Sequence, residues 1–397
     1  MKIIDYFLKI IFFFLFLYYK YLIVFSYKCF FKYNNLNISN NVSQRTLKFN
    51  NKYNALQFLQ KCVNNTLKDQ ILLSYNYIII PKISIIIPLH NCQLTIETTI
   101  KSIQYQNLYK FEIILVNDFS SDNTSIVIKN MQKEDKRIKF INNKKNMGIL
   151  YSRCIGALKS KGNYIFVLDN DDLFSDHKIL KTIFIKAKKN NFDIVEFKAF
   201  DISSYNPDIN DFKDDYFNHH QKNIILHQPE LGLFPISKKN KYYPNNYHLW
   251  GKCFLSRIYK KAVNSLGIKR FSIYNCWTED ISILIIIFNL AESYIFLDIY
   301  GIFHLISRNT TTFKLPKVQL LFSNIYLLDI LIDFLKNDEK SKIYAVYKAL
   351  KFKQNELITN KKASSYFKEV LKKLLDCKFI NKKDKMKLLK KFKFMFN

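Results

Sequence analysis

The stretch Tyr164–Phe174 reads Tyr-Ile-Phe-Val-Leu-Asp-Asn-Asp-Asp-Leu-Phe and decides the fold prediction. It begins with a short apolar run containing β-branched residues, which is typical of a buried strand. The run leads directly into Asp169, Asp171 and Asp172. Burying that much negative charge costs several kcal/mol per group unless a cation neutralises it. The motif therefore predicts either a divalent metal site or a set of acids that cap a following helix.

Apolar runs alternate with helical stretches from Ile83 onward, which predicts a parallel sheet with crossover helices. We predict strands at 83–87, 111–116, 138–141 and 164–168, and helices at 95–106 and 149–160. Pro88 is expected to end the first strand. Polar residues follow three of these strands, at His90, at Asp118 and at 169–172. Ligands of open α/β sheets collect outside the carboxyl ends of the strands, so these positions predict one binding site.

The second half of the chain has a less regular pattern. We predict a strand at 192–200, a helix at 281–291, strands at 294–297 and 299–304, and helices at 320–335, 342–352 and 366–396. Lys pairs alternate with Leu, Phe and Met in the last stretch. That alternation fits either a face lying on anionic lipid or solvated helices packed on the preceding domain.

Residues 1–33 are densely apolar. A bilayer-spanning helix needs about 20 mainly apolar residues, and one Lys near the bilayer centre costs about 2.5–3.5 kcal/mol. We predict a single-pass membrane anchor here, with a cleaved signal peptide or a buried helix as alternatives. Lys residues on both sides leave the membrane orientation open. In a eukaryote the anchor would place the protein in the endomembrane system. Residues 34–81 are polar and rich in Asn, and we interpret them as a stem.

The 397 residues include 62 Lys and Arg against 32 Asp and Glu, a net charge of +30. This balance permits contact with nucleic acid, anionic lipid or phosphate-bearing substrates. No helix-turn-helix, zinc-finger or aromatic RNA-binding pattern accompanies it, so no nucleic-acid partner is predicted. The seven cysteines are scattered and form no Cys-x-x-Cys pair, which indicates neither a disulfide framework nor a zinc site.

Four motifs follow one another in the first half of the predicted sheet: Ile83–Asn91, Glu112–Thr124, Asn146-Met147-Gly148 with Arg153, and Leu168–Asp172. Together they resemble the nucleotide-sugar half of the family 2 glycosyltransferases, whose GT-A fold is a Rossmann-like, mainly parallel sheet flanked by helices. The acidic motif resembles that family's Asp-x-Asp. Two positions depart from the family pattern, because Asn117 stands where an acid is usual and His90 where Tyr is usual. Both departures bear on how the nucleotide base is held.

The resemblance implies a role for each matching residue. Asp118 would accept hydrogen bonds from the base, Asp169 would contact the ribose or the metal's water shell, and Asp171 would bind a Mn²⁺ or Mg²⁺ that bridges the diphosphate. Asp172 would support the metal ligands or cap a helix. The same motifs imply further nucleotide-sugar contacts from Pro88, His90, Asn91, Ser120, Asn146, Gly148, Arg153, Asp169 and Asn170.

The segment Trp277-Thr278-Glu279-Asp280 is similar to the family's Glu-Asp motif. The resemblance implies that Asp280 is the general base and that Glu279 is its supporting neighbour. The alternative is that both acids simply occupy the start of a helix, where carboxylates are common.

The remaining resemblances concern the acceptor and the phosphates. Trp250 and Lys252 resemble the family's Trp-x-Lys segment before the acceptor site, where Trp250 would face a sugar ring or pack in the core. His304 would bind the metal or the diphosphate, with a structural histidine as the alternative. Arg308 would pair with phosphate as a fork.

The sequence therefore predicts four parts: a membrane anchor (1–33), a stem (34–81), a GT-A catalytic domain (82–312) and a basic helical region (313–397). The enzyme would move a sugar from a metal-bound nucleoside diphosphate sugar to a hydroxyl of a glycan, lipid-linked or protein-linked acceptor, with inversion. One alternative is a nucleotidyltransferase, although a Gly-rich, basic phosphate loop is missing near the first strand. The other is an inactive nucleotide-sugar or glycan-binding protein, which the presence of both Asp171 and Asp280 disfavours.

Overall fold

The computed structural model describes residues 46–48, 80–203, 225–227, 248–267, 278–306, 317–334, 349, 354–377 and 380–396. The chain divides into two compact units, Met1–Leu47 and Lys48–Asn397. The short strand β1 (Thr46–Lys48) holds the only described residues of the first unit. The predicted anchor and most of the predicted stem thus lie outside the described residues. Within the described ranges, no helix is both long and apolar enough to cross a bilayer.

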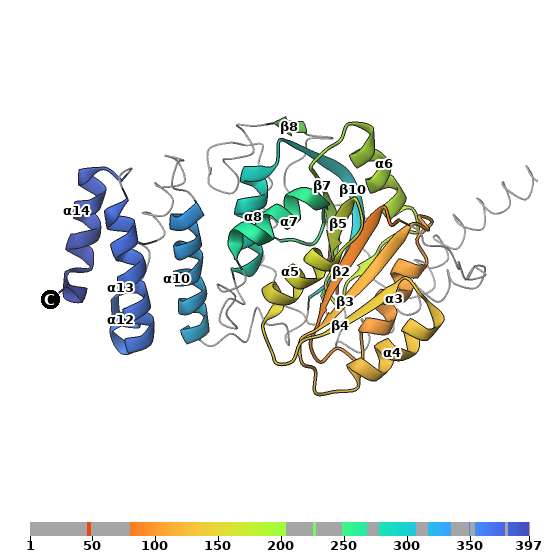
Figure 1. The fold of residues 1–397 in the computed structure, drawn as a ribbon, viewed down its shortest axis with the longest axis horizontal. Helices are drawn as coiled ribbons and strands as arrows, with labels where there is room; N and C mark the ends of the chain where they lie inside the picture. Colours follow the sequence, from red (N-terminus) through yellow and green to blue (C-terminus); the bar gives the residue numbers. More distant parts are fainter. Residues whose placement is uncertain are drawn as a thin grey trace, which may run out of the picture. The chain divides into compact units, whose positions relative to one another are not determined.

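The second unit is built around a mixed sheet with the strand order β4-β3-β2-β5-β9-β7-β10-β6 (Figure 1). The strands are β2 (Ile83–Leu89), β3 (Phe111–Asn117), β4 (Ile138–Asn142), β5 (Tyr164–Val167), β6 (Leu173–Phe174), β7 (Ile194–Ser203), β8 (Ile225–His227), β9 (Lys252–Leu255) and β10 (Ser293–Ile306). The β4-β3-β2-β5 half is parallel, as predicted. In the other half, β9 runs antiparallel to β5 and β7, whereas β10 runs parallel to β7. Both β6 and β8 pair antiparallel with β10.

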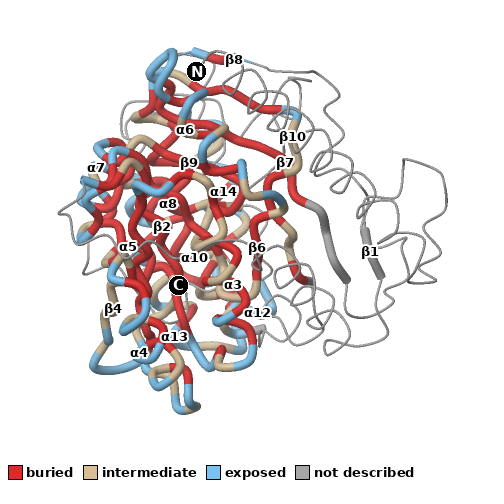
Figure 2. The backbone as a smooth tube through the Cα atoms, turned by 90° about the vertical axis from the view of Figure 1, so that its right-hand side faces the viewer, coloured by how far each residue is buried: buried red, intermediate tan, exposed pale blue. Residues whose placement is uncertain are grey.

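Helices cover both faces of the sheet, because β2 and β3 are buried along their whole lengths and present apolar residues to both sides. On one face, β2 residues Ile85 and Ile87 share a core with α3 (Ile96–Gln104), α4 (Thr124–Glu134) and α6 (Ile179–Lys189). On the other face, Ile86 shares a core with α5 (Ile149–Lys159), α7 (Ser256–Leu266) and α8 (Glu279–Leu290). Figure 2 shows the buried backbone running through the sheet and α8.

The basic C-terminal region adds a third core. Helix α10 (Lys317–Phe334) packs against α8, and α13 (Lys361–Asp376) packs against α10 and α12 (Gln354–Thr359). Helix α14 (Lys382–Lys391) and the following turn η4 (Lys393–Met395) contribute Leu388, Phe392 and Met395 to the same core. The predicted helix at 342–352 lies outside the described residues except for position 349.

Strand β2 continues through Pro88, so the predicted end of the first strand at that proline is wrong. The carbonyl of Ile86 accepts a hydrogen bond from Leu168 N at 3.1 Å. The backbone N–H and C=O groups of the even-numbered residues of β2 therefore point toward β5. Pro88 faces the same way but lies beyond the last residue of β5, Val167. Its missing N–H therefore breaks no ladder bond. Its carbonyl instead accepts a hydrogen bond from Asn170 Nδ2 at 3.1 Å.

Several later elements differ from the sequence predictions. Helix α6, strand β9 and helix α7 fall in stretches for which no element was predicted, and the predicted strands 294–297 and 299–304 form the single strand β10. The pairing of β10 with β7 shifts register between Leu297 and Ile302. Such a bulge interrupts the alternation of side chains without ending the strand, which explains why one strand reads as two.

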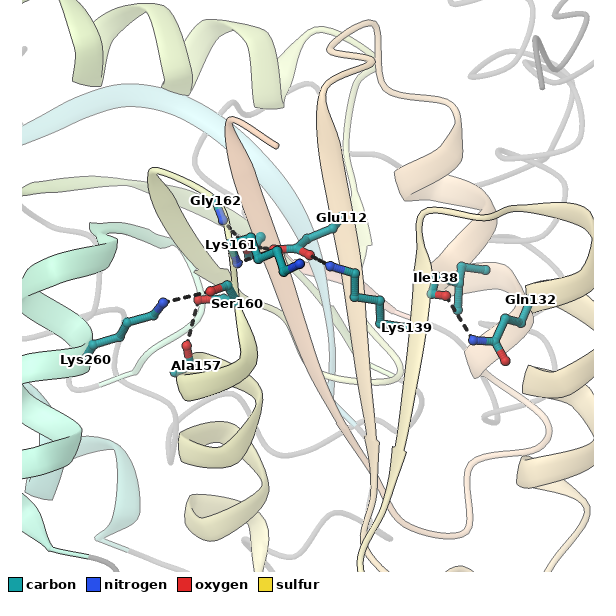
Figure 3. A network of polar contacts seen from close by, with 10 residues as sticks. Glu112, Gln132, Ile138, Lys139, Ala157, Ser160, Lys161, Gly162 and Lys260 are labelled. Atoms are coloured by element: carbon teal, nitrogen blue, oxygen red, sulfur yellow. Dashed lines mark hydrogen bonds and ion pairs between the residues drawn. The ribbon is translucent and has the colours of Figure 1, made fainter. Parts of the chain in front are cut away.

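A polar network joins the amino ends of the central strands (Figure 3). The buried carboxylate of Glu112 on β3 accepts hydrogen bonds from Ser84 Oγ and from the backbone N of Lys161, both at 2.5 Å, and pairs with Lys139 on β4. Gly162 N donates to Ser84 Oγ at 2.8 Å. Glu112 therefore links β2, β3, β4 and the turn before β5 at the sheet edge opposite the loops described below.

Glu112→Gln is expected to lower the free energy of unfolding by about 1–3 kcal/mol near neutral pH, because a buried acceptor of charged hydrogen bonds is lost. Burial would raise the pKa of Glu112, but hydrogen bonds from Lys139, Ser84 and the Lys161 backbone hold the pKa below its usual 4.5. A carboxylate with a lowered pKa stabilises the fold above its unfolded-state pKa, and this contribution disappears as pH falls through the folded pKa.

Urea titrations at several pH values would measure this effect. The difference between wild type and Glu112→Gln should shrink steadily below about pH 4.5. Glu97→Gln is the matched control, because Glu97 is 54% exposed and pairs with Lys101 on a helix surface. The control should change stability by no more than about 0.5 kcal/mol. If Glu112→Gln lowered the free energy of unfolding by the same amount at every pH, the ionisation of Glu112 would contribute nothing to stability.

Candidate active site

The loops that follow β2 and β3 are joined by hydrogen bonds from their side chains. Asn91 N donates to Ser120 Oγ at 3.0 Å, and Asn91 Oδ1 accepts from Ser121 N at 2.8 Å. The Nδ1 atom of His90 lies 2.9 Å from the carbonyl of Asp118. Three predicted nucleotide-sugar contacts, His90, Asn91 and Ser120, are therefore brought together at the carboxyl edge of the parallel strands, as the strand pattern predicted.

Asp118 holds the loop between β4 and α5. Its Oδ1 accepts hydrogen bonds from Asn143 Nδ2 and Met147 N, both at 2.8 Å, and its Oδ2 accepts from Gly148 N at 2.7 Å. Gly148 has a φ of 89°, a backbone conformation that favours glycine. Asp118 therefore fixes the loop that carries Asn146.

Asn117 uses its amide in a way that an acid could not. Its Nδ2 donates to Ser125 Oγ at 3.1 Å and to Asn142 Oδ1 at 2.9 Å. Its Oδ1 accepts from the backbone N and the hydroxyl of Ser120, at 3.2 and 2.5 Å. An ionised carboxylate has no donor, so it could not make the first two bonds. The departure from the family pattern at this position thus fits the local hydrogen bonding.

Arg153 is the centre of an acidic cluster. Its side chain is 2% exposed, and its Nη2 donates to Asp169 Oδ1 at 2.8 Å. Its Nη1 pairs with Asp280 Oδ1 and lies 4.0 Å from Glu279 Oε1. Asp280 Oδ2 accepts a hydrogen bond from Leu249 N at 2.9 Å. Because one guanidinium contacts both carboxylates, Asp169 and Asp280 lie on the same side of the sheet and in the same site.

The charges in this cluster shift one another's pKa values. Burial would lower the pKa of Arg153, but Asp280, Asp169 and Glu279 raise it above its usual value. Burial and the neighbouring Asp280 raise the pKa of Glu279 to about 8. Burial also raises the pKa of Asp280, against the opposing effect of Arg153. Glu279 therefore carries a proton for much of the time at neutral pH, which relieves the repulsion among the three acids.

The acidic loop after β5 leads into strand β6 and not into a helix, so the alternative that these acids cap a helix is wrong. The loop is fixed at both sides: Asn170 donates to Pro88 O, and Thr99 Oγ1 donates to Asn170 O at 3.0 Å. Asp172 is fully buried, and its Oδ1 accepts a hydrogen bond from Leu305 N of β10 at 3.1 Å. Burial raises the pKa of Asp172, while His304 lowers it. Asp172 thus connects the acidic loop to β10.

Trp250 stacks on two imidazoles at this end of the sheet. Its ring centroid lies 4.7 Å from that of His248 and 4.5 Å from that of His304, with interplanar angles of 11° and 25°. Trp250 is 5% exposed, which leaves little of the ring open to a sugar. Burial lowers the pKa of His248 to about 3, so this imidazole is neutral. The stack places His304 beside the acidic loop and β9.

Lys252 lies in the core. Its side chain is 0% exposed, and its Nζ donates to His248 O at 2.8 Å and lies 3.3 Å from Glu196 Oε1. A fully enclosed ammonium offers no surface to an acceptor, so the predicted acceptor contact does not fit this position. Lys252 instead ties the Trp250 segment to β7, because Glu196 belongs to that strand.

Residues 84–260 match the family model Glycosyl transferase family 2. This segment is a family 2 glycosyltransferase domain. It contains the four motifs of the sheet half except for Ile83, and it ends at residue 260, so Glu279 and Asp280 lie beyond the matched range. The family assignment confirms the resemblance drawn from the sequence motifs.

Bacterial relatives match parts of this chain. The GalNAc(5)-diNAcBac-PP-undecaprenol beta-1,3-glucosyltransferase of Campylobacter jejuni is 42% identical over 93 residues, which cover 23% of this chain and 30% of the relative. The uncharacterised glycosyltransferase EpsJ of Bacillus subtilis is 36% identical over 116 residues, 29% of this chain and 33% of EpsJ. The matched region therefore spans about a third of either relative.

The fold is similar to that of a solved glycosyltransferase. The crystal structure of S. aureus TarS in complex with UDP superposes with a TM-score of 0.54 at 15% identity, over 79% of this chain and 88% of that one. At this identity the likeness concerns the fold alone. It supports a GT-A-like α/β architecture for the glycosyltransferase domain.

One predicted site residue, Arg308, lies outside the described residues. The sequence analysis also missed contributors. His248 stands next to the predicted acceptor segment without an assigned role, and the backbone N of Leu249 binds Asp280. Backbone donors carry no signature in a sequence, so only the fold reveals them.

Proposed function

We propose that the chain transfers a sugar from a nucleoside diphosphate sugar to an acceptor hydroxyl, with inversion at the anomeric carbon. The observation that carries this proposal is the shared guanidinium of Arg153, which contacts Asp169 from the donor motif and Asp280 from the start of α8. An acid from each half of the chain therefore faces one site. A transfer reaction needs such a pair, with one group near the leaving diphosphate and another near the attacking hydroxyl.

Asp280 is the proposed general base. As the acceptor oxygen bonds to the anomeric carbon, its proton passes to a carboxylate oxygen of Asp280, and the bond from the anomeric carbon to the diphosphate oxygen breaks. Burial raises the pKa of Asp280, which makes it a better proton acceptor than an exposed aspartate. Leu249 N orients one of its oxygens, and the largely protonated Glu279 adds no full second charge beside it.

A divalent ion is the proposed cofactor, with Asp171 and Asp169 as its protein ligands and His304 as a further candidate. The described residues contain no cluster of three or more His, Cys, Asp or Glu placed to hold a metal by themselves. This donor set fits Mg²⁺ or Mn²⁺ in the form that uses one or two carboxylates and completes its shell with phosphate oxygens and water. Bound there, the ion would neutralise charge on the leaving diphosphate.

Asp171→Ala is expected to weaken metal-dependent donor binding about 100-fold or more, because a carboxylate ligand is lost. Calorimetric titration of UDP-sugar into the full chain, with and without Mn²⁺, would measure it. Asp176→Ala is the matched control from the same segment, since Asp176 Oδ1 accepts from Lys178 N on the surface. If Asp171→Ala left the Mn²⁺-dependent affinity for UDP-sugar unchanged, Asp171 would not be a ligand of the metal.

The donor and acceptor classes follow from the relatives as proposals. TarS has been crystallised with UDP and with UDP-GlcNAc, which suggests a UDP-sugar donor here. The name of the C. jejuni relative describes a glycan on undecaprenyl diphosphate, which suggests a lipid-linked glycan acceptor. An anchor formed by residues 1–33 would hold the enzyme at the membrane that contains such an acceptor.

Release of nucleoside diphosphate from a panel of sugar nucleotides, with Mn²⁺ and lipid-linked acceptors, would test this function. Transfer requires nucleoside diphosphate as the product. Pyrophosphate release would instead show a nucleotidyltransferase, and donor binding without turnover would show an inactive binding protein.

A further inference from the structure

Helix α14 exposes apolar side chains on the face that points away from the core. Leu388, Phe392 and Met395 are buried, and they recur every three or four residues on one face. On the opposite face, Met386 is 61% exposed and Leu389 is 41% exposed. The outward face of this helix therefore carries exposed apolar side chains.

Lysines surround these apolar side chains. Lys382, Lys390 and Lys393 are exposed and share the outward face with Met386, each three or four residues from a neighbour on that face. Among the described carboxylates, none pairs with these three lysines, whereas Lys387 pairs with Asp384 at 3.0 Å. The face thus combines unneutralised cations with exposed apolar groups. We call the set Lys382, Met386, Leu389, Lys390 and Lys393 the α14 face.

Aromatic residues extend the apolar surface at the end of α14. Phe394 and Phe396 are each 38% exposed, and Lys368 of α13 lies over the ring of Phe396 at 5.7 Å. Phe392 packs edge-on against Phe367 of α13, with ring centroids 5.0 Å apart, which fixes α14 on α13. The exposed side chains are therefore carried by a helix that is anchored in the third core.

We propose that the α14 face docks on an anionic phospholipid surface. A helix that presents Met, Leu and Phe among lysines can bury its apolar groups at the boundary of head groups and acyl chains while the ammonium groups contact lipid phosphates. A protein partner for this face would require acidic groups at fixed positions opposite the lysines. A bilayer with anionic lipids offers phosphate groups to the lysines and an apolar interior to Met386 and Leu389.

This inference goes beyond the proposed sugar transfer and does not depend on it. Docking through α14 would add a second membrane contact to any anchor at the N-terminus. Two weak contacts on one chain bind a membrane more tightly than either contact alone. Because the α14 contact involves anionic head groups, it depends on lipid charge and on salt, whereas insertion of an apolar segment does not.

Photo-crosslinking with a diazirine phospholipid would test the docking. The full chain is reconstituted into phosphatidylcholine vesicles with or without phosphatidylglycerol, and lipid adducts are mapped by mass spectrometry. Adducts are expected on residues 381–396 with phosphatidylglycerol, and they should fall strongly in pure phosphatidylcholine. They should also fall at about 1 M salt, where the screening length is about 3 Å. Since residues 1–33 are present throughout, the readout is local to α14.

Variants make the test specific. Met386→Ser combined with Leu389→Ser should reduce the adducts by roughly tenfold or more, because the burial of either side chain alone is worth about that factor. Both positions are exposed, so the fold should persist. Ile126→Ser is the control, as Ile126 is 59% exposed on α4 near Lys129 and Lys133. Adducts on 381–396 that are absent, independent of lipid charge or unchanged in the double variant would overturn the proposal.

Discussion

Asp280→Asn is expected to lower kcat for sugar transfer about 10²- to 10⁴-fold, the usual range for the loss of a general base. Asparagine can still accept the hydrogen bond from Leu249 N, and it keeps the shape of the side chain. It cannot take the proton of the acceptor hydroxyl. Donor affinity should therefore stay within a few-fold of wild type, since the donor motif is intact.

Glu279→Gln is the matched control for this prediction. Because the pKa of Glu279 is raised to about 8, its carboxyl is largely protonated at neutral pH and glutamine resembles the form that predominates. The control should retain kcat within about tenfold of wild type. Steady-state and single-turnover release of nucleoside diphosphate would compare the two variants. Near-normal turnover in Asp280→Asn, or an equal loss of kcat in both variants, would show that Asp280 is not the general base.

Arg153→Met is expected to lower the free energy of unfolding by about 3–5 kcal/mol, the largest stability effect that we predict. Methionine fills much of the space but leaves Asp169, Asp280 and Glu279 without their common cation. The buried carboxylates must then take up protons or rearrange. Arg153→Lys should lie between wild type and Arg153→Met, because an ammonium keeps the charge but lacks the planar fork.

Chemical denaturation of the full chain would measure the Arg153 effect. Lys101→Met provides the control, because Lys101 also pairs with a carboxylate, that of Glu97, but the two side chains are 38% and 54% exposed. We expect the control to cost about 1 kcal/mol or less. A loss in Arg153→Met no greater than that of the control would mean that the acidic cluster does not depend on the guanidinium.

The parallel half of the fold could be predicted from the sequence because each strand consists mainly of apolar residues. Strands β2, β3 and β5 are buried along their whole lengths, and the polar residues that follow them mark the site edge. The antiparallel half could not be predicted in this way. Strand β9 has only four residues, among them the buried Lys252, whose charge hides the strand from a hydropathy pattern.

The identities of the acidic residues in the site were predictable, but their connection was not. Asp169, Asp280 and Arg153 each belong to a motif recognised in the sequence, but nothing in the sequence indicates that Arg153 pairs with both acids. Its contact with Asp280 joins residues 127 positions apart. That contact depends on the packing of α5 against α8, and no local pattern encodes such packing.

Single-turnover release of nucleoside diphosphate from a UDP-sugar, with acceptor in excess, tests the central claim most directly. The wild-type chain and Asp280→Asn are loaded with the same bound donor and Mn²⁺. The account predicts prompt release by the wild type, and release by Asp280→Asn that is slower by about 10²-fold or more. Equal release rates from the same amount of bound donor would contradict it.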